Sequence, residues 1–161
     1  MILVTVGMQL GFDRLIKAMD ELAPSLSEPV VAQTGKGRYA PLHMRAQESM
    51  TPAEFDSHVQ QARLIVSHAG IGTILTAARW SKPIALLARR ADLNEHRNDH
   101  QLATAENLKG RPGILVATEV SDLPRIVAQG LQLGTVAHTG AAQAATLHKA
   151  VAKFIDTGSV S

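Results

Sequence analysis

Two glycines in one short turn, Gly70 and Gly72, have the type and spacing that suit a ligand site. They follow the apolar run 64–66 and precede a stretch with helical periodicity, so the turn connects a buried strand to the start of a helix. The absence of side chains lets a ligand touch the backbone, and the first N–H groups of a helix are unpaired and carry positive dipole character. These features suit a diphosphate, and Thr73 adds a hydroxyl donor.

The turn has two other interpretations. The glycines can simply permit a tight strand-to-helix connection, with no ligand. They can also belong to a dinucleotide-binding module, because Asp92 lies 20 residues after Gly72, where an acid that holds an NAD ribose would sit, and Arg89 and Arg90 could hold a 2′-phosphate. Against the second interpretation, Leu75 occupies the third position of the fingerprint, where Gly or Ala allows close helix packing.

A metal site is a further hypothesis. His96 and His100 are four residues apart, on one face of an expected helix, with Asp99 beside them. Two ligands do not make a site, however, and the sequence contains no HExxH pattern. We expect no bound metal.

Alternating apolar runs and helical patterns surround these residues. We expect strands at 2–6, 29–33, 42–47, 64–66, 84–88 and 114–117. We expect helices at 12–22, at 74–80 and at 95–108, the last with Asn94 as its cap. Two further helices are expected to start at a capping box at Thr51 and at a Ser121 cap. Residues that mark a final helix are Leu147, Val151, Phe154 and Ile155.

This alternation predicts an α/β fold, a single doubly wound parallel-sheet, Rossmann-like domain. The 161 residues allow one domain, which we expect at 1–155 with a flexible tail at 156–161. Ligands of such sheets bind beyond the carboxyl ends of the strands. The site is therefore expected in the loops 7–11, 34–37, 67–73 and 89–101.

Composition excludes several classes of function. The 16 basic and 14 acidic residues give a net charge of +2, and only 3% of residues are aromatic, so we expect no nucleic acid partner. The sequence has no cysteine for a disulfide or a thiolate metal site. The apolar run 2–6 is too short for a signal peptide or a membrane span, and we expect a soluble, cytoplasmic protein.

Several segments together resemble the donor-binding domain of family-28 glycosyltransferases. They are residues 64–75, Lys82-Pro83 with the aliphatic strand after it, and residues 95–101. The opening residues 4–7 and Phe12-Asp13 are similar to the first strand and loop of the same group. More narrowly, the chain resembles the small single-domain subunits of bacterial exopolysaccharide transferases and of the eukaryotic enzyme that adds the second N-acetylglucosamine to dolichol-linked chitobiose.

The resemblance implies a function. It implies the C-terminal half of a GT-B glycosyltransferase, which binds a UDP-sugar as donor substrate without another cofactor and transfers the sugar with inversion. It also implies a membrane-anchored, acceptor-side partner subunit and a lipid-linked glycan acceptor, with the protein held peripherally at the inner face of the membrane. A UDP-sugar sensor without catalysis is an alternative.

The resemblance also assigns residues, although it identifies no general base. The residues that match the glycine turn around the diphosphate are His68, Gly70, Gly72 and Thr73. Those that match the segment reaching the donor sugar and phosphate are Asn98, His100 and Gln101. The first loop is matched by Thr5 and Gly7. One departure is Thr76, where related enzymes often carry a Glu that holds the ribose hydroxyls. Either Thr76 makes a weaker bond or another residue, such as Glu95, takes this role.

Overall fold

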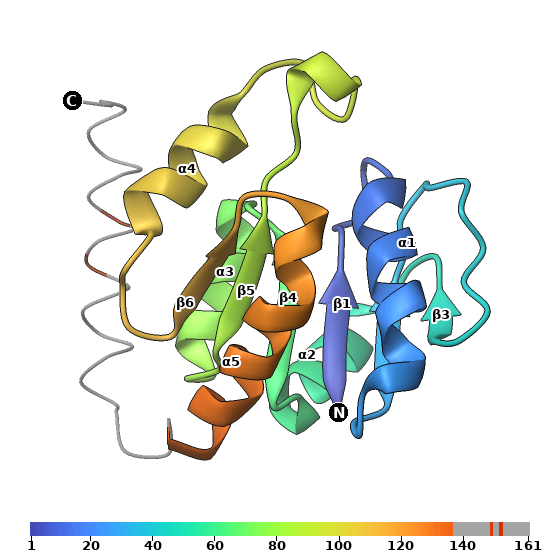
Figure 1. Ribbon diagram of the computed structural model, residues 1–161, viewed down its shortest axis with the longest axis vertical. Helices are drawn as coiled ribbons and strands as arrows, with labels where there is room; N and C mark the ends of the chain where they lie inside the picture. The colour runs from blue at the N-terminus through green and yellow to red at the C-terminus, as the bar shows by residue number, and fades with distance from the viewer. Residues whose placement is uncertain (137–148, 150–151, 153–161) are drawn as a thin grey trace.

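Six parallel strands form one sheet in the order β3-β2-β1-β4-β5-β6 (Figure 1). The computed structural model describes residues 1–136, 149 and 152. The strands are β1 (Ile2–Thr5), β2 (Val30–Gln33), β3 (Arg45–Gln47), β4 (Leu64–His68), β5 (Ile84–Leu87) and β6 (Ile114–Ala117). The strand order reverses direction between β1 and β4, so the crevice for a ligand is expected between the loops that follow these two strands.

Helices cover both faces of the sheet, which confirms the predicted doubly wound fold. They are α1 (Asp13–Leu22), α2 (Pro52–Gln61), α3 (Ile71–Arg79), α4 (His100–Leu108) and α5 (Leu123–Val136), with short 3-10 turns at Ala23–Ser25, Ala91–Leu93 and Val120–Asp122. In Figure 1, α1 and α5 lie in front of the sheet and α2 and α3 behind it.

Two hydrophobic clusters, one on each face, hold the layers together. On one face, Ile2 and Val4 of β1 pack with Ile16 of α1 and Val127 of α5. On the other, residues of the strands pack with α2, α3 and α4, among them Leu3, Ile65, Val59, Ile74 and Leu108. Strands that are buried on both faces explain the near-continuous apolar runs in the sequence.

The third strand is shorter than predicted. It begins at Arg45, whereas residue 42 was expected to open it. The cause is the buried carboxylate of Asp20, which accepts the backbone N–H groups of Leu42 and His43 at 2.7 to 3.1 Å. These N–H groups are unavailable to the sheet, and the Leu42 side chain is 83% exposed.

The helix expected at 95–108 begins at His100, so its predicted start was wrong. Asn94 does not cap it: this residue ends the Ala91–Leu93 turn with a left-handed φ of 55°. His96 therefore lies before the helix, and the assumption that His96 and His100 share a helical face does not hold.

Of two other predicted helix caps, one is confirmed and one is wrong. The Thr51 capping box is confirmed, with Glu54 N–H donating to the Thr51 hydroxyl. Ser121, however, is not a cap; Glu119 and Asp122 form the capping box before α5. The final helix expected around Leu147, Val151, Phe154 and Ile155, and the tail at 156–161, lie outside the described residues.

Candidate functional site

The loops after β1 and β4 lie side by side at the carboxyl edge of the sheet. Thr5 of β1 pairs in register with Ser67 of β4. Gly7, which follows β1, has a φ of 75°, a backbone conformation that favours glycine. The segment 89–99 rises from the end of β5 at the same edge, at the top of Figure 1. The crevice predicted from the strand order is thus lined by the segments that the sequence singled out.

The two glycines of the turn are required for different reasons. Gly70 is the N-cap of α3, and a Cβ there would lie 2.0 Å from Cε1 of His68, so the imidazole ring excludes a side chain. Gly72 lies in the first turn of α3 and is exposed, and a Cβ there would meet no atom of the described residues within 4 Å. The protein itself gives no steric reason for Gly72, which leaves the backbone at the helix start open to a ligand.

His68 stands between the two loops. Its Nδ1 lies 3.1 Å from Gln101 Nε2 and 3.5 Å from Arg89 Nη1. Its Nε2 faces Gly7, where an added Cβ would lie 3.4 Å away. Burial, together with the positive charge of Arg89, lowers the pKa of His68 to about 4, so the ring is neutral at pH 7.

Arg89 is a buried cation, 4% exposed, that holds the loop after β1. Its Nη2 donates to the carbonyl groups of Val6 and Leu10, both at 2.8 Å. The guanidinium carbon lies 5.3 Å from the centroid of the Phe12 ring, a cation–π geometry. No described carboxylate forms an ion pair with Arg89, and its buried Nε has no hydrogen-bond partner there.

Thr5 supports the same loop from beneath. Its hydroxyl donates to Gln33 Oε1 at 2.7 Å and accepts the N–H of Gly7 at 3.3 Å. The residue is only 1% exposed. Thr5 therefore helps to shape the loop, and direct contact with a nucleotide stays a prediction.

The three residues expected near the donor sugar are not equivalent. His100 is exposed, and its backbone N–H donates to Asn98 Oδ1 at 3.3 Å. Asn98 Oδ1 also lies 3.1 Å from Nδ1 of His96. Gln101 instead is 8% exposed and points inward, toward His68 and Arg89. Their role at a donor sugar stays a prediction.

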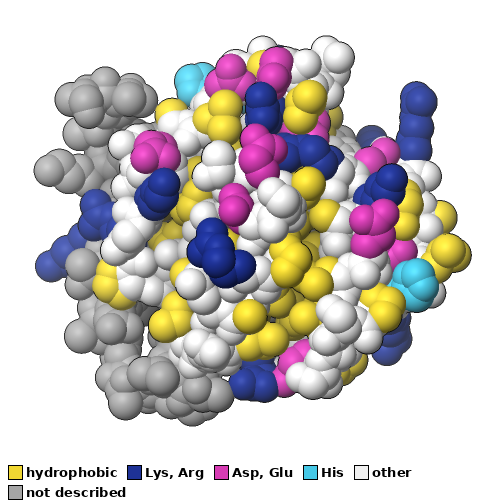
Figure 2. Space-filling view, in the orientation of Figure 1, with side chains coloured by type: hydrophobic (Ala, Val, Ile, Leu, Met, Phe, Trp, Pro, Cys, Tyr) yellow, Lys and Arg dark blue, Asp and Glu magenta, His cyan; other side chains and the backbone are white. Residues whose placement is uncertain are grey.

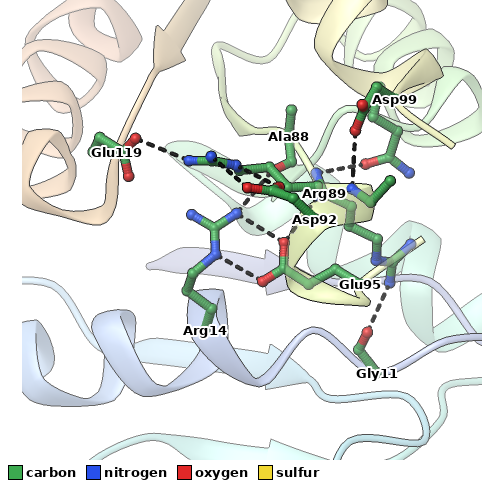
Figure 3. Close-up of polar contacts among 11 residues, drawn as sticks. Gly11, Arg14, Ala88, Arg89, Asp92, Glu95, Asp99 and Glu119 are labelled. Carbon is green, nitrogen blue, oxygen red and sulfur yellow. Dashed lines mark hydrogen bonds and ion pairs between the residues drawn. The ribbon is translucent and has the colours of Figure 1, made fainter. Parts of the chain in front are cut away.

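Glu95 is held by the Arg14 side chain and by the backbone of Arg90. Its carboxylate accepts two hydrogen bonds from Arg14, as Figure 3 shows, and a third from the backbone N–H of Arg90. Asp92, the acid of the dinucleotide interpretation, pairs with the Arg90 side chain at 2.8 Å. Thr76 donates its hydroxyl to the carbonyl of Gly72 at 2.9 Å. A ribose would have to compete with these bonds at each of the three residues.

A cleft lies between the loop after β1 and the segment after β5. Its volume is about 540 Å³, and its lining residues are Gln9, Leu10, Asn94, Glu95, His96 and Arg97. Figure 2 shows basic and acidic side chains interspersed near the top of this face rather than one charged patch. Within the described part of the chain, no group of three His, Cys, Asp or Glu side chains is placed to hold a metal ion.

Sequence reasoning missed two structural residues of this site. Arg89 was considered for a phosphate, a membrane surface or a solvated positive loop and not as a structural residue, yet its position directly after an aliphatic strand was a signal that the guanidinium could be buried beneath a loop. Arg14 was not considered, because its partner Glu95 is 81 residues away in the sequence.

Comparison with known proteins defines the class. Residues 1–156 match the model of the glycosyltransferase family 28 C-terminal domain, and the chain belongs to this family. No curated protein sequence matches the chain. The described helices include none that is both long and apolar enough to cross a membrane.

Solved structures share the fold. The glycotransferase of kitacinnamycin superimposes with a TM-score of 0.65 at 19% identity, over 94% of this chain and 39% of that one. MurG of Acinetobacter baumannii gives a TM-score of 0.59 at 17% identity, and the superposition covers 91% of this chain and 48% of MurG. Glycosyltransferase SsfS6 of Streptomyces sp. SF2575, complexed with thymidine diphosphate, gives a TM-score of 0.56 at 17% identity. This superposition covers 96% of this chain and 37% of SsfS6. The chain thus has the Rossmann-like fold of the C-terminal half of GT-B glycosyltransferases and spans less than half the length of these enzymes.

Proposed function

We propose that this chain is the donor-binding part of an inverting glycosyltransferase that moves a sugar from a UDP-sugar to a lipid-linked glycan. The observation that carries the proposal is the open backbone at Gly72, at the start of α3 and beside the reversal of strand order. A diphosphate suits this place because unpaired N–H groups and the helix dipole attract negative charge. The structure of a relative in complex with thymidine diphosphate supports a nucleoside diphosphate as the kind of ligand.

The proposed reaction is displacement at the anomeric carbon by an acceptor hydroxyl, and the leaving diphosphate is its difficult charge. As the bond from the anomeric carbon to the phosphate oxygen breaks, its electrons pass to the diphosphate. N–H groups at Gly72 and Thr73 stabilise this charge without reorganisation, and the buried Arg89 adds a positive potential. The acceptor proton must pass to a base within hydrogen-bond reach, which we place on the acceptor-side partner.

The partner is part of the proposal. The chain spans 37% to 48% of the neighbouring structures described above, and we propose that a partner subunit supplies the second wall that encloses the donor. Met8, Leu10 and Leu93 are exposed hydrophobic residues on the loops of this edge. We propose a membrane-anchored subunit that covers them and holds the protein peripherally at the inner face of the membrane.

A thermal-shift and calorimetry series tests the donor. UDP is expected to raise the melting temperature, and NADPH is not, while dTDP, which adds a methyl group to the base and lacks the 2′-hydroxyl, tests whether these two groups matter. Equal or greater protection by NADPH would support the dinucleotide module. The absence of protection by both nucleoside diphosphates would contradict the proposal.

A matched pair of variants locates the site. Gly72→Asp places bulk and negative charge at the second residue of α3 and is expected to abolish UDP binding. Ala53→Asp places the same side chain at the second residue of α2, where it is also exposed, and should leave UDP affinity unchanged. Retained affinity in Gly72→Asp would remove this turn from the site.

Catalysis needs a separate assay. The protein should transfer labelled sugar from one member of a panel of UDP-sugars when the membrane fraction that holds its co-purified partner is supplied. Binding of a UDP-sugar with no transfer under these conditions would favour the sensor.

A further inference from the structure

The amide of Gln101 has both of its ends engaged. Its Oε1 accepts the backbone N–H of Arg89 at 3.2 Å, and its Nε2 lies 3.1 Å from Nδ1 of His68. A backbone N–H can only donate, so the oxygen of the amide must face Arg89. The NH2 group therefore faces His68 and donates to its Nδ1.

A second donor faces the same ring nitrogen. Nη1 of Arg89 lies 3.5 Å from Nδ1 of His68, and a guanidinium has no acceptor. Nδ1 must then carry a lone pair, because a proton on it would point at two donors. A neutral imidazole with a bare Nδ1 carries its proton on Nε2.

The charged surroundings of the ring favour this neutral form. Burial of the ring and then the positive charge of Arg89, from the end of β5, lower its pKa, and His96 of the following segment shifts the pKa in the same direction. The NH2 group of Gln101 of α4 donates to Nδ1 and so also favours the neutral ring, and the two other neighbours, Gly7 and Gly70, bring no charge.

Nε2 faces the proposed diphosphate site. It lies 3.4 Å from the place that a Cβ of Gly7 would fill, between the loop after β1 and the glycine turn. No hydrogen-bond partner for Nε2 exists among the described residues. This donor thus lies between Gly7 and Gly70, the N-cap of α3, and a Cβ on Gly70 would lie 2.9 Å from Nε2.

We infer that Gln101 and Arg89 are positioning residues that hold His68 as a neutral Nε2–H donor for a phosphate oxygen of the nucleotide. The tautomer is a property of this chain alone, whereas the ligand rests on the proposed function. This role differs from the sugar contact that the family resemblance implies for Gln101, because it acts on the nucleotide through His68.

Nitrogen-15 NMR of the histidine rings tests the tautomer in the ligand-free protein. At pH 7, His68 should show a pyridine-type shift at Nδ1 and a pyrrole-type shift at Nε2. Gln101→Glu keeps the shape and the acceptor for Arg89 N–H but replaces the donor by a carboxylate, so Nδ1 should become protonated. Gln60→Glu, an exposed position on α2, is the control and should leave the His68 shifts unchanged. A protonated Nδ1 in the wild type, or unchanged His68 shifts in Gln101→Glu, would overturn the inference.

Titration with UDP tests the ligand. Bound UDP should move the Nε2 resonance of His68, and Gln101→Glu should weaken UDP and UDP-sugar equally, by about tenfold, since a hydrogen bond to a charged group contributes about this much. If UDP binds and Nε2 does not respond, or if only UDP-sugar binding weakens, the inference is wrong and the donor proposal stands. If UDP does not bind at all, the donor proposal fails, and the ligand-free spectrum still decides the tautomer.

Discussion

The carboxylate of Glu95 receives two hydrogen bonds from the guanidinium of Arg14, one from Nε at 2.7 Å and one from Nη2 at 2.9 Å. Nη2 also donates to the carbonyl of Ala88 at 3.0 Å. Figure 3 shows Arg14 reaching from the start of α1 to the segment that follows β5. One arginine thus connects α1 to the segment after β5 that lines one side of the cleft.

Loss of this connection should loosen the segment after β5. Arg14→Leu leaves the partly buried Glu95 without its cation and should lower the free energy of unfolding by about 2 kcal/mol. Hydrogen exchange of the Arg90 amide, which bonds to Glu95, should accelerate. Lys17→Leu is the control: its pair with Glu21 is exposed and 3.9 Å long, so the change should stay within about 0.5 kcal/mol. Equal effects of the two substitutions would contradict this account.

The two glycines of the turn should respond differently to alanine. Gly72→Ala meets open space, so stability should be unchanged or rise by up to about 1 kcal/mol, whereas UDP affinity should fall at least about tenfold. Gly70→Ala forces the His68 ring aside and should cost about 1 to 3 kcal/mol. Denaturant unfolding and calorimetry with UDP measure both effects. A destabilised Gly72→Ala protein would show that this glycine serves the fold.

His68 should make stability depend on pH. Its pKa is about 4 in the folded protein, below the value of 6.5 for a free side chain, so the unfolded chain binds more protons between these values. Stability should be fully present above pH 6.5 and fall as the pH drops toward 4, by at most about 3 kcal/mol. His68→Gln lacks this component. Unfolding curves at several pH values give the free energy of unfolding of both proteins. Between pH 4 and 6.5 this free energy should change more steeply with pH in the wild type than in His68→Gln, and equal slopes would contradict the prediction.

Asp20 should be critical for the path of residues 39–43. Burial raises the pKa of Asp20. Hydrogen bonds from the backbone of Leu42 and His43 and from the Tyr39 hydroxyl lower this pKa by more than burial raises it, so the net shift is downward. Asp20→Asn loses one acceptor oxygen and should lower the free energy of unfolding at pH 7 by about 2 kcal/mol. Glu21→Gln, next in sequence and 66% exposed on its side chain, should have almost no effect. Because the folded pKa of Asp20 is depressed, its contribution should disappear as the pH falls through that value, and this loss should be missing in Asp20→Asn.

Much of the fold could be predicted because the apolar runs are local signals. The runs 64–66 and 114–117 are continuous and aliphatic, 2–6 is interrupted only by Thr5, and the Thr51 capping box is a four-residue pattern. The true start of β3 could not be predicted, since it depends on a carboxylate 22 residues earlier that removes the Leu42 N–H from the sheet. Likewise, the helix expected from residue 95 starts at His100 because Arg14 and the Arg90 backbone hold Glu95.

The candidate site was predictable in its loops and less so in its side chains. The strand order brings Gly7 and the glycine turn together, as the fold class implies. Whether a polar residue points toward a ligand or into the protein depends on neighbours from distant segments. Thr5 and Gln101 point inward because Gln33 and His68 receive their hydrogen bonds, and no spacing in the sequence indicates this.

Gly11 and Gly37 bring the loops after β1 and β2 into close backbone contact. A Cβ on Gly11 would lie 2.5 Å from the Cα of Gly37, and one on Gly37 would collide with the Asp13 carboxylate. Chimeras that exchange only one of these loops with a homologue carrying a larger residue at position 11 would therefore misfit. The two segments have to be grafted as a unit.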